Sequence, residues 1–270
     1  MFERIGFIGT GAMGGAVAKL VYEAAPTAEL YLANRTAEKA AALASRLPGA
    51  VVSTNAEAAG KCELIFLAVK PQMMPGVLAG IAPVLAGRRD RFVLVTMAAG
   101  LTMDTIRTMA GGDYPVIRMM PNTPITVGAG AVQYCGLGVT GDELAAFAAL
   151  LSGAGTVDPL PEHLIDAASA VSGCGPAFVD LFLEALADGG VACGLPRPKA
   201  MAYAAAMVEG AAKMARLSGD HPGALKDAVC SPAGSTIQGV RALEKGAFRG
   251  AVMDAVIAAY EKNRELGRRQ

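Results

Sequence analysis

The sequence predicts an α/β domain with a doubly wound parallel sheet, followed by an all-helical domain. Up to about residue 160, short apolar runs rich in β-branched residues alternate with alanine-rich stretches of helical length. This alternation is typical of a parallel sheet covered by helices on both faces. From about residue 162 the strand pattern stops and the chain reads as helices. We therefore expect one domain over residues 1–160 and a second over residues 161–270.

The strand candidates of the first domain are apolar on both faces, as buried strands of a parallel sheet are. They are residues 4–9, 29–35, 50–53, 63–69, 92–98 and 115–120, followed by two later runs at 129–134 and 155–160. The helix candidates between them are residues 12–24, 36–47, 73–86 and 102–110.

The helical segments of the second domain begin or end at Gly, Pro or Ser, the residues that usually mark helix ends. They are residues 162–173, 175–194, 196–219, 221–230, 231–246 and 247–267. Two glycines and a proline within residues 172–178 interrupt one helical pattern, which predicts a kink or a restart.

Composition argues against several classes of protein. Lys and Arg together number 24, as do Asp and Glu, so the chain lacks the positive field that nucleic acids or anionic membranes require. The alanine-rich apolar segments 145–155 and 201–212 are shorter than the ~20 residues needed to cross a bilayer. Five scattered cysteines without a CxxC pair indicate a reduced, cytoplasmic protein, and two histidines make a zinc site improbable. We expect no nucleic-acid, membrane or metal binding.

Three glycines follow the first strand candidate at the spacing that dinucleotide-binding folds use. Gly9, Gly11 and Gly14 form G-x-G-x-x-G directly before the helix candidate 12–24. In such folds the first glycine allows a tight turn, the second lets the pyrophosphate approach, and the third permits close helix–strand packing. This context predicts a Rossmann-type domain that binds a dinucleotide, the alternative being a purely structural turn.

The end of the second strand candidate favours NADP over NAD. NAD enzymes commonly place Asp or Glu there to bind the ribose 2′-hydroxyl group, whereas this chain has Asn34, Arg35 and Thr36. No carboxylate repels a 2′-phosphate group, and the Arg35 guanidinium can pair with one. The alternative is that Arg35 is a solvated surface charge. We expect NADPH as the cofactor, with NADH a weaker substitute.

Small or polar residues also follow three later strand candidates, around Lys70, Thr96–Leu101 and Arg118–Pro124. Ligands of doubly wound sheets bind beyond the carboxyl ends of the strands, so Lys70 is expected to face the cofactor cleft. The alternative for Lys70 is a surface lysine at the start of a helix.

A second candidate site lies at residues 230–239, which read CSPAGSTIQG. The hydroxyl groups of Ser231, Ser235 and Thr236 surround a Pro-Ala-Gly turn that opens a helix, an arrangement suited to a carboxylate. The alternative is a capped helix start, since Ser-Pro is an ordinary pair there.

Six segments occur in an order that resembles the Δ1-pyrroline-5-carboxylate reductase family over nearly the full chain. They are GTGAMG at 9–14, NRT at 34–36, AVKPQ at 68–72, RMMPNTP at 118–124, SGCGPAF at 172–178 and SPAGSTIQG at 231–239. The lead-in HPGALKDAV at 221–229 is similar as well.

The resemblance implies the last step of proline biosynthesis, in which NADPH reduces the C=N bond of 1-pyrroline-5-carboxylate to give L-proline. It further implies an N-terminal NADPH-binding domain and a C-terminal domain that dimerises through intertwined helices. Dimers of this family often associate into decamers. The substrate is expected between the nicotinamide and the SPAGST loop of a neighbouring subunit.

Carried over residue by residue, the resemblance assigns substrate binding to Ser231, Gly234, Ser235 and Thr236, with Thr236 as the catalytic residue that bonds the ring nitrogen. It assigns cofactor binding to Gly9, Thr10, Gly11, Ala12, Met13, Gly14, Asn34, Arg35, Thr36, Asn55, Ala68, Val69, Lys70, Pro71, Ala98, Ala99, Gly100 and Asn122.

Two positions depart from the family pattern. Ala233 stands where the family loop usually has glycine, so Ala233 is strained by about 1 kcal/mol or more if the position requires positive φ. Cys174 replaces a serine of the family segment, and a thiol is the weaker hydrogen-bond partner.

Two other functions compete with this one. A 3-hydroxyacid dehydrogenase of the β-hydroxyisobutyrate type should carry a catalytic lysine in its first interdomain helix, and residues 167–178 contain none. A non-catalytic NADP-binding sensor has no need of the intact SPAGST loop.

Overall fold

The computed structural model describes residues 2–268, which pack as two units. The first unit comprises the chain up to Cys174 together with the segment from Ala259 onward, and the second is Gly175–Ala258. The helix that follows the last strand therefore packs with the sheet, although the sequence pattern places the change from strands to helices near residue 160.

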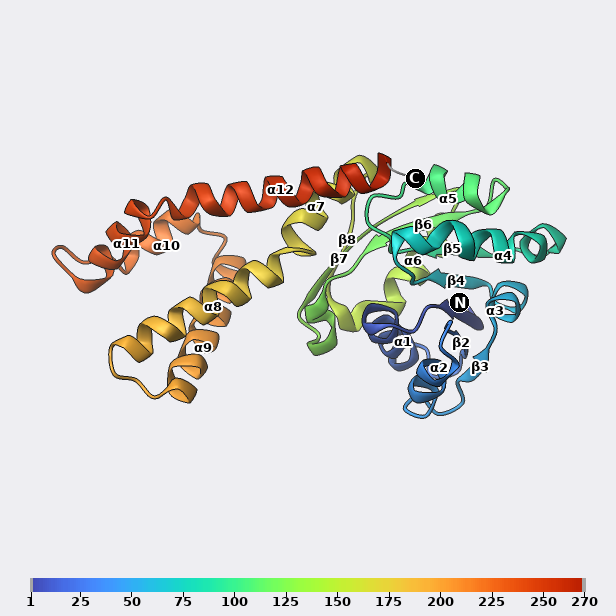
Figure 1. The fold of residues 1–270 in the computed structure, drawn as a ribbon, viewed down its shortest axis with the longest axis horizontal. Helices are drawn as coiled ribbons and strands as arrows, with labels where there is room; N and C mark the ends of the chain where they lie inside the picture. Colours follow the sequence, from blue (N-terminus) through green and yellow to red (C-terminus); the bar gives the residue numbers. More distant parts are fainter. Residues whose placement is uncertain (1, 269–270) are drawn as a thin grey trace. The chain divides into compact units, whose positions relative to one another are not determined.

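An eight-stranded sheet forms the centre of the first unit, in the order β3-β2-β1-β4-β5-β6-β7-β8 (Figure 1). The strands are β1 Arg4–Ile8, β2 Glu29–Ala33, β3 Val51–Ser53, β4 Leu64–Leu67, β5 Val93–Thr96, β6 Val116–Met120, β7 Gly130–Leu137 and β8 Gly155–Pro159. The strand order reverses between β1 and β4, which makes this the switch point of a doubly wound sheet. All pairs are parallel except β6 with β7.

Helices surround this sheet. They are α1 Ala12–Ala24, α2 Ala37–Ala44, α3 Asn55–Lys61, α4 Met74–Gly87, α5 Met103–Ala110, α6 Gly141–Leu150 and α7 Glu162–Ser172, with 3-10 turns at Pro71–Met73, Thr123–Val127 and Ser152–Ala154. The sequence pattern predicts α1, α2, α4, α5 and α7 but not α3 or α6. Both of these begin at a threonine capping box, formed by Thr54 with Glu57 and by Thr140 with Glu143.

Two buried clusters, one on each face of the sheet, form the core. Alternate strand residues supply them, because successive side chains of a strand point to opposite faces. Phe7 and Phe66 belong to the cluster with α1 and α6, and their rings stack at 4.5 Å between centroids. Ile8 and Leu67 belong to the other cluster, with α3, α4 and α5. The apolar strand runs are therefore explained by burial on both faces.

Arg118 on β6 joins α7 to the sheet. Its side chain is 1% exposed, and its Nη2 donates to Asp166 of α7 at 2.5 Å. Its Nη1 lies 3.6 Å from Glu162, whose Oε1 also accepts from the backbone N–H of Met103. A polar residue near the end of a strand therefore anchors a helix here. A buried guanidinium is tolerated because two carboxylates compensate it.

Helices alone make up the second unit. They are α8 Gly175–Ala192, α9 Arg197–Ser218, α10 Pro222–Ala228, α11 Ser235–Lys245 and the first part of α12 Phe248–Arg268. Large apolar side chains on these helices are exposed, including Leu181 (67%), Tyr203 (58%) and Met214 (56%). The expected interruption within 172–178 is confirmed as a restart, because α7 ends at Ser172 and α8 begins at Gly175.

One stretch within residues 2–268, Glu162–Ala192, has the length and composition of a membrane span. Its most apolar window has a mean hydropathy of 1.4 and is 11% buried. This stretch differs from residues 145–155 and 201–212, the apolar segments that the sequence analysis considered.

We predict that Arg118→Met lowers the free energy of unfolding by roughly 3 kcal/mol, because Asp166 and Glu162 then lose their counter-charge. The matched control is Arg249→Met, which removes an exposed pair with Glu244 and should cost less than about 1 kcal/mol. Urea unfolding at one fixed protein concentration measures both. Equal losses in the two variants would show that Arg118 does not anchor α7.

Candidate functional site

The loops after β1, β2 and β4 lie side by side at the carboxyl edge of the sheet. The backbone N–H of Gly9 donates to the carbonyl of Ala33 at 2.8 Å, and that of Ala68 donates to the carbonyl of Ile8, also at 2.8 Å. The predicted glycine-rich, NRT and AVKPQ segments are thus brought together at the switch point of the sheet, where doubly wound folds bind ligands.

The three glycines have three different surroundings. Gly9 has φ +107°, and a Cβ atom there would lie 2.3 Å from the carbonyl oxygen of Ala68. A Cβ atom on Gly14 would lie 2.2 Å from the carbonyl oxygen of Gly9. A Cβ atom on Gly11 would meet nothing within 4 Å. Two glycines are therefore required by packing within the chain, and the third leaves open space over the loop.

The N-terminus of α1 is suited to an anion. Its N-cap residue is Gly11, which offers no side chain to cap the free N–H groups, and its first turn holds no acidic residue. The hydroxyl oxygen of Thr10 is buried and has no hydrogen-bond partner within the described chain. The bare helix end, the open space at Gly11 and this unused hydroxyl fit the phosphates of a dinucleotide. Ala12 and Met13 form the first turn of the same helix.

Asn34 ties the loop after β2 to the glycine-rich loop. Its Oδ1 accepts from the backbone N–H of Thr10 at 3.2 Å, and its Nδ2 donates to the carbonyl of Thr36 at 3.0 Å. Arg35 and Thr36 are exposed, and the Thr36 side chain does not cap α2 although Thr36 is the N-cap residue. Asn34 therefore positions the loop and leaves the two neighbours free to contact a ligand.

The remaining predicted cofactor residues lie at the same edge or next to it. Asn55 is half-buried at the start of α3, and Lys70 is exposed directly before the 3-10 turn that begins at Pro71. Val69 is half-buried beside Ala68, while Ala98 is buried and bonds the Thr96 hydroxyl through its N–H at 3.3 Å.

The loop of Ala98, Ala99 and Gly100 is held by a contact that the sequence does not reveal. Gly100 has φ +77°, and a Cβ atom there would lie 2.6 Å from the carbonyl oxygen of Asn263. A Cβ atom on Gly267 would lie 2.2 Å from the carbonyl oxygen of Gly100. The last turns of α12 thus pack directly on this loop.

The Asn122 side chain is occupied within the chain. Its Oδ1 accepts from the N–H of Ala131 at 2.9 Å, and its Nδ2 donates to the carbonyl of Ser172 at 3.0 Å. In this structure the side chain connects the end of β6 to β7 and α7, so a contact of Asn122 with a cofactor stays a prediction.

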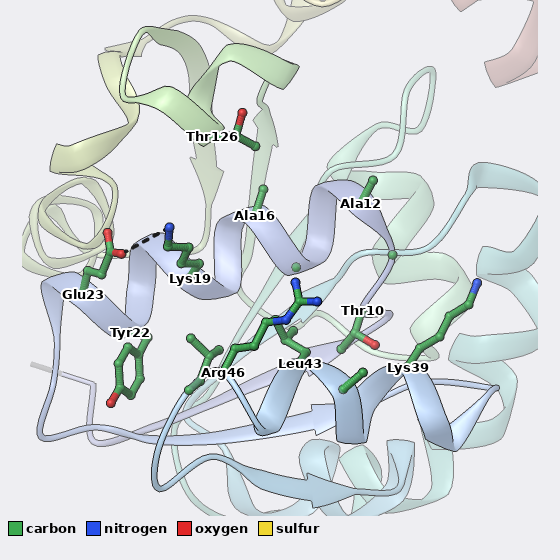
Figure 2. A pocket seen from close by; sticks show the side chains of 14 residues that line it. Thr10, Ala12, Ala16, Lys19, Tyr22, Glu23, Lys39, Leu43, Arg46 and Thr126 are labelled. Atoms are coloured by element: carbon green, nitrogen blue, oxygen red, sulfur yellow. Dashed lines mark ion pairs between the residues drawn. The ribbon is translucent and has the colours of Figure 1, made fainter.

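A cavity of about 760 Å³ extends from the glycine-rich loop between α1 and α2 (Figure 2). Its lining includes Thr10, Gly11, Ala12 and Lys39 near the glycine-rich loop and Lys19, Tyr22 and Glu23 further along α1, while the Arg46 side chain extends toward Thr10 between these two groups. The sequence pattern did not single out Lys19, Lys39 or Arg46. Lys39 could have been found from the sequence, because it stands in the first turn of the helix that follows NRT.

The second candidate site is built separately, within the helical unit. Gly234 is the N-cap of α11 and provides no side-chain cap, so the N–H groups of Ser235 and Thr236 open the helix uncapped. The N–H of Gly234 donates to the carbonyl of Ser231 at 3.0 Å, which closes the turn. Ser231, Ser235 and Thr236 are exposed, and their hydroxyl groups bond nothing in the described chain. Hydroxyl and N–H donors of this kind suit a carboxylate.

The α11 loop, residues 230–239, contains no histidine and no charged side chain. Within residues 2–268 no three His, Cys, Asp or Glu side chains are placed to hold a metal ion. Burial raises the pKa values of the Cys62 and Cys135 thiols, to about 12 and about 11, which favours their protonated form at neutral pH.

Comparison with known proteins gives a match for the strand-containing part of the chain and another for the helical part. Residues 162–266 match the family model described as pyrroline-5-carboxylate reductase dimerisation, and residues 4–100 match the one described as NADP oxidoreductase, coenzyme F420-dependent. The pyrroline-5-carboxylate reductase of Synechocystis is 42% identical over 100% of both chains. That of Escherichia coli is 38% identical over 99% of this chain and 100% of its own. This chain belongs to the pyrroline-5-carboxylate reductase family.

Solved structures of pyrroline-5-carboxylate reductases share the fold over nearly the whole length. The Plasmodium falciparum enzyme, solved with NADP bound, is 32% identical with a TM-score of 0.85 and a match over 98% of each chain. The Streptococcus pyogenes enzyme is 28% identical with a TM-score of 0.88, over 97% of this chain and 98% of its own.

The two departures from the pyrroline-5-carboxylate reductase pattern differ in their structural effect. Ala233 has φ +59°, in the left-handed region that costs an L-residue about 1–2 kcal/mol. The strain expected if this position needs positive φ is therefore present, next to the bare N-terminus of α11. Cys174 lies half-buried between α7 and α8, where its backbone N–H donates to the carbonyl of Ser169 at 3.1 Å.

We predict that Gly11→Ala leaves the melting temperature unchanged but weakens NADPH binding by about 10-fold or more, because the added methyl group fills the space that the phosphates need. Gly80→Ala in α4 is the control, since its Cβ atom would also meet nothing within 4 Å and Gly80 lies outside the cavity lining. Isothermal titration calorimetry measures both affinities. Unaltered NADPH affinity in Gly11→Ala would place the phosphates elsewhere.

We predict that Ala233→Gly raises the free energy of unfolding by about 0.5–1 kcal/mol, because relief of left-handed strain exceeds the entropy that glycine adds to the unfolded chain. Ala247, with φ +54°, is a matched position outside the loop, and Ala247→Gly should give a similar gain. Ala233→Val should lower stability. Thermal unfolding tests the series, and a loss in Ala233→Gly would contradict the strain.

Proposed function

We propose that this protein reduces 1-pyrroline-5-carboxylate to L-proline with NADPH, the last step of proline biosynthesis. The observation that carries the proposal is the uncapped N-terminus of α11, which carries three unpartnered hydroxyl groups in a loop without any acid or base. Membership of the pyrroline-5-carboxylate reductase family supports the same reaction.

When bound, NADPH supplies the hydride that adds to the imine carbon, while the nitrogen retains a proton. The chain contributes the cofactor-binding edge described above, with Gly9, Gly11 and Gly14 at its centre. NADPH is preferred over NADH because the strand end carries Arg35 where a carboxylate would repel the 2′-phosphate group. The NADP named in the Plasmodium falciparum structure supports this choice.

The α11 loop holds the substrate through its carboxylate. The N–H groups of Ser235 and Thr236 and the hydroxyl groups of Ser231 and Ser235 are the donors, and the helix dipole favours the negative charge. A fixed carboxylate orients the ring, so that one face of the C=N bond is presented for reduction.

Thr236 orients the imine by a hydrogen bond between its hydroxyl group and the ring nitrogen. A protonated imine is already electrophilic, so a strong general acid is unnecessary. This accounts for a site built from hydroxyl and N–H groups rather than from a histidine or paired carboxylates.

The alternatives receive less support. The structure of a 3-hydroxyisobutyrate dehydrogenase from Mycobacterium tuberculosis is 13% identical with a TM-score of 0.51, which shows a shared fold alone. No lysine occurs in α7 or within residues 173–178, where that chemistry requires one. A non-catalytic NADP-binding sensor would not need the carboxylate-binding groups of the α11 loop.

The assembly follows from the exposed apolar surface of the helical unit. A second copy of the chain covers it in a homodimer, in line with the dimerisation model that matches residues 162–266. The apolar stretch Glu162–Ala192 lies within that match, so we assign it to the dimer rather than to a membrane. Association of dimers into decamers, a cytoplasmic location and the absence of nucleic-acid partners are further parts of the proposal.

The reaction is tested by initial rates of NADPH oxidation with and without racemic 1-pyrroline-5-carboxylate, with L-proline identified as the product and NADH as the competing cofactor. Substrate-dependent oxidation that is faster with NADPH is expected. If the folded protein binds NADPH but does not oxidise it in the presence of substrate, the proposed reaction is contradicted, whereas the proposed cofactor site is not.

We predict that Thr236→Ala lowers kcat by about 10- to 1,000-fold, the effect of losing one oriented donor, without changing NADPH affinity. Thr236→Ser should retain most of the activity because it keeps the hydroxyl group. Ser218→Ala at the end of α9 controls for loss of a hydroxyl in the same unit. Steady-state kinetics that match the wild type in Thr236→Ala would remove Thr236 from the mechanism.

A further inference from the structure

We propose that Glu162 and Gly267 are positioning residues for the nicotinamide half of NADPH, and that they act through the loop that follows β5. This loop, residues 97–102, is called the β5 loop. The inference rests on the proposed function, because it requires that the chain bind a nicotinamide dinucleotide. It goes further by giving a role to the first turn of α7 and to the last turn of α12.

The strand order places the β5 loop on the nicotinamide side of the expected cofactor. A doubly wound sheet binds one nucleotide over each of its halves, with the pyrophosphate at the switch point. Here β1, β2 and β3 form one half, and β4, β5 and β6 form the other. Arg35, the residue expected at the 2′-phosphate group of the adenosine, follows β2. The nicotinamide nucleotide is therefore expected over the ends of β4 and β5.

The β5 loop has little conformational freedom of its own. Ala98 and Leu101 are buried in the apolar cluster that includes residues of α3, α4 and α5, and Ala99 between them is half-buried. Gly100 is buried as well and has φ +77°, a conformation that L side chains rarely adopt. Because packed interiors transmit small displacements, the position of this loop depends on the elements that cover it.

The last turns of α12 cover the β5 loop at Gly100. A Cβ atom on Gly267 would lie 2.2 Å from the carbonyl oxygen of Gly100, and one on Gly100 would lie 2.6 Å from the carbonyl oxygen of Asn263. These segments belong to the same unit, which includes the chain from Ala259 onward. Glycine weakens a helix, so this close approach accounts for a glycine at position 267.

Glu162 fixes the other end of the β5 loop. Its Oε1 accepts from the backbone N–H of Met103, the first residue of α5, at 2.7 Å. A carboxylate is favoured there by the free N–H groups and the dipole of the helix. Arg118, whose Nη1 lies 3.6 Å from the same oxygen, holds the carboxylate in place. The β5 loop is thus fixed by α7 and α12, neither of which carries an expected cofactor residue.

A displaced β5 loop would affect the two halves of NADPH differently. Hydride transfer requires an exact position of the nicotinamide, and an error of about 1 Å costs up to about 100-fold in rate. The adenosine half is expected at the ends of β1 and β2, away from the β5 loop. Changes at Glu162 or Gly267 should therefore weaken NADPH binding but not the binding of a ligand without nicotinamide.

The experiment is calorimetric titration of the full-length protein with NADPH and with 2′,5′-ADP, which contains the adenosine half of NADPH but no nicotinamide. Gly267→Ala displaces the loop, and Glu162→Ala removes its hydrogen bond. Each should weaken NADPH binding by about 3- to 10-fold and leave the 2′,5′-ADP affinity unchanged. In both variants, kcat for reduction of 1-pyrroline-5-carboxylate should fall by about 10- to 100-fold.

Two further variants are the controls. Glu162→Gln keeps an oxygen that accepts from the N–H of Met103, so it should retain most of the NADPH affinity that Glu162→Ala loses. Gly80→Ala adds the same methyl group to α4 at a place where its Cβ atom would meet nothing within 4 Å, and it should change neither affinity. Melting temperatures define the range in which each variant is folded, and all titrations are made within it.

The outcomes separate this inference from the proposed reaction. Unchanged NADPH affinity in Gly267→Ala or in Glu162→Ala would remove that residue from the proposal, and equal weakening of both ligands would show a general structural effect instead. A wild type that does not bind NADPH would overturn the cofactor site and this inference together. A wild type that binds NADPH but does not reduce the imine contradicts the reaction alone, and the affinities of the variants still decide the inference.

Discussion

The close approach of the glycine-rich loop to β4 and α1 is the constraint on which the cofactor half depends. Gly9 turns the chain against Ala68, and Gly14 brings α1 against the carbonyl of Gly9, with no room for a Cβ atom at either place. This packing fixes the N-terminus of α1 at the switch point of the sheet. It also sets the neighbouring loops in register, because Gly9 and Ala68 bond the ends of adjacent strands. Side chains at these two glycines would move the anion-binding end of the helix away from the sheet.

Two helices of the chain begin in the same way, at a glycine that leaves their first N–H groups without a side-chain cap. Helices α1 and α11 both begin at a glycine N-cap without a side-chain cap, whereas α3, α5 and α6 are capped by threonines. Uncapped N–H groups are costly to bury but well suited to phosphates and carboxylates. In the proposed function, the N-terminus of α1 binds the cofactor phosphates and that of α11 binds the substrate carboxylate. The left-handed backbone of Ala233 shows that the loop before α11 is strained.

The sequence predicted the features that follow from local pattern and missed those that depend on packing. Alternation of apolar runs with helical stretches was sufficient for the sheet, because each strand is buried on both faces. The short helices α3 and α6 were missed although each has a capping box, since seven and ten residues give little periodicity. Arg118, singled out as a polar strand end, instead binds Asp166 of α7, a residue 48 positions away. The contact of Gly267 with Gly100 likewise joins distant segments, so no local pattern could indicate it.

The most direct test of the account is a crystal structure of the protein with NADP⁺ and L-proline bound. The account predicts the pyrophosphate on the N-terminus of α1 at Gly11, the 2′-phosphate group at Arg35, and the proline carboxylate on the N–H groups of Ser235 and Thr236. A dinucleotide bound away from the glycine-rich loop, or a proline carboxylate held by groups other than those of the α11 loop, would contradict it.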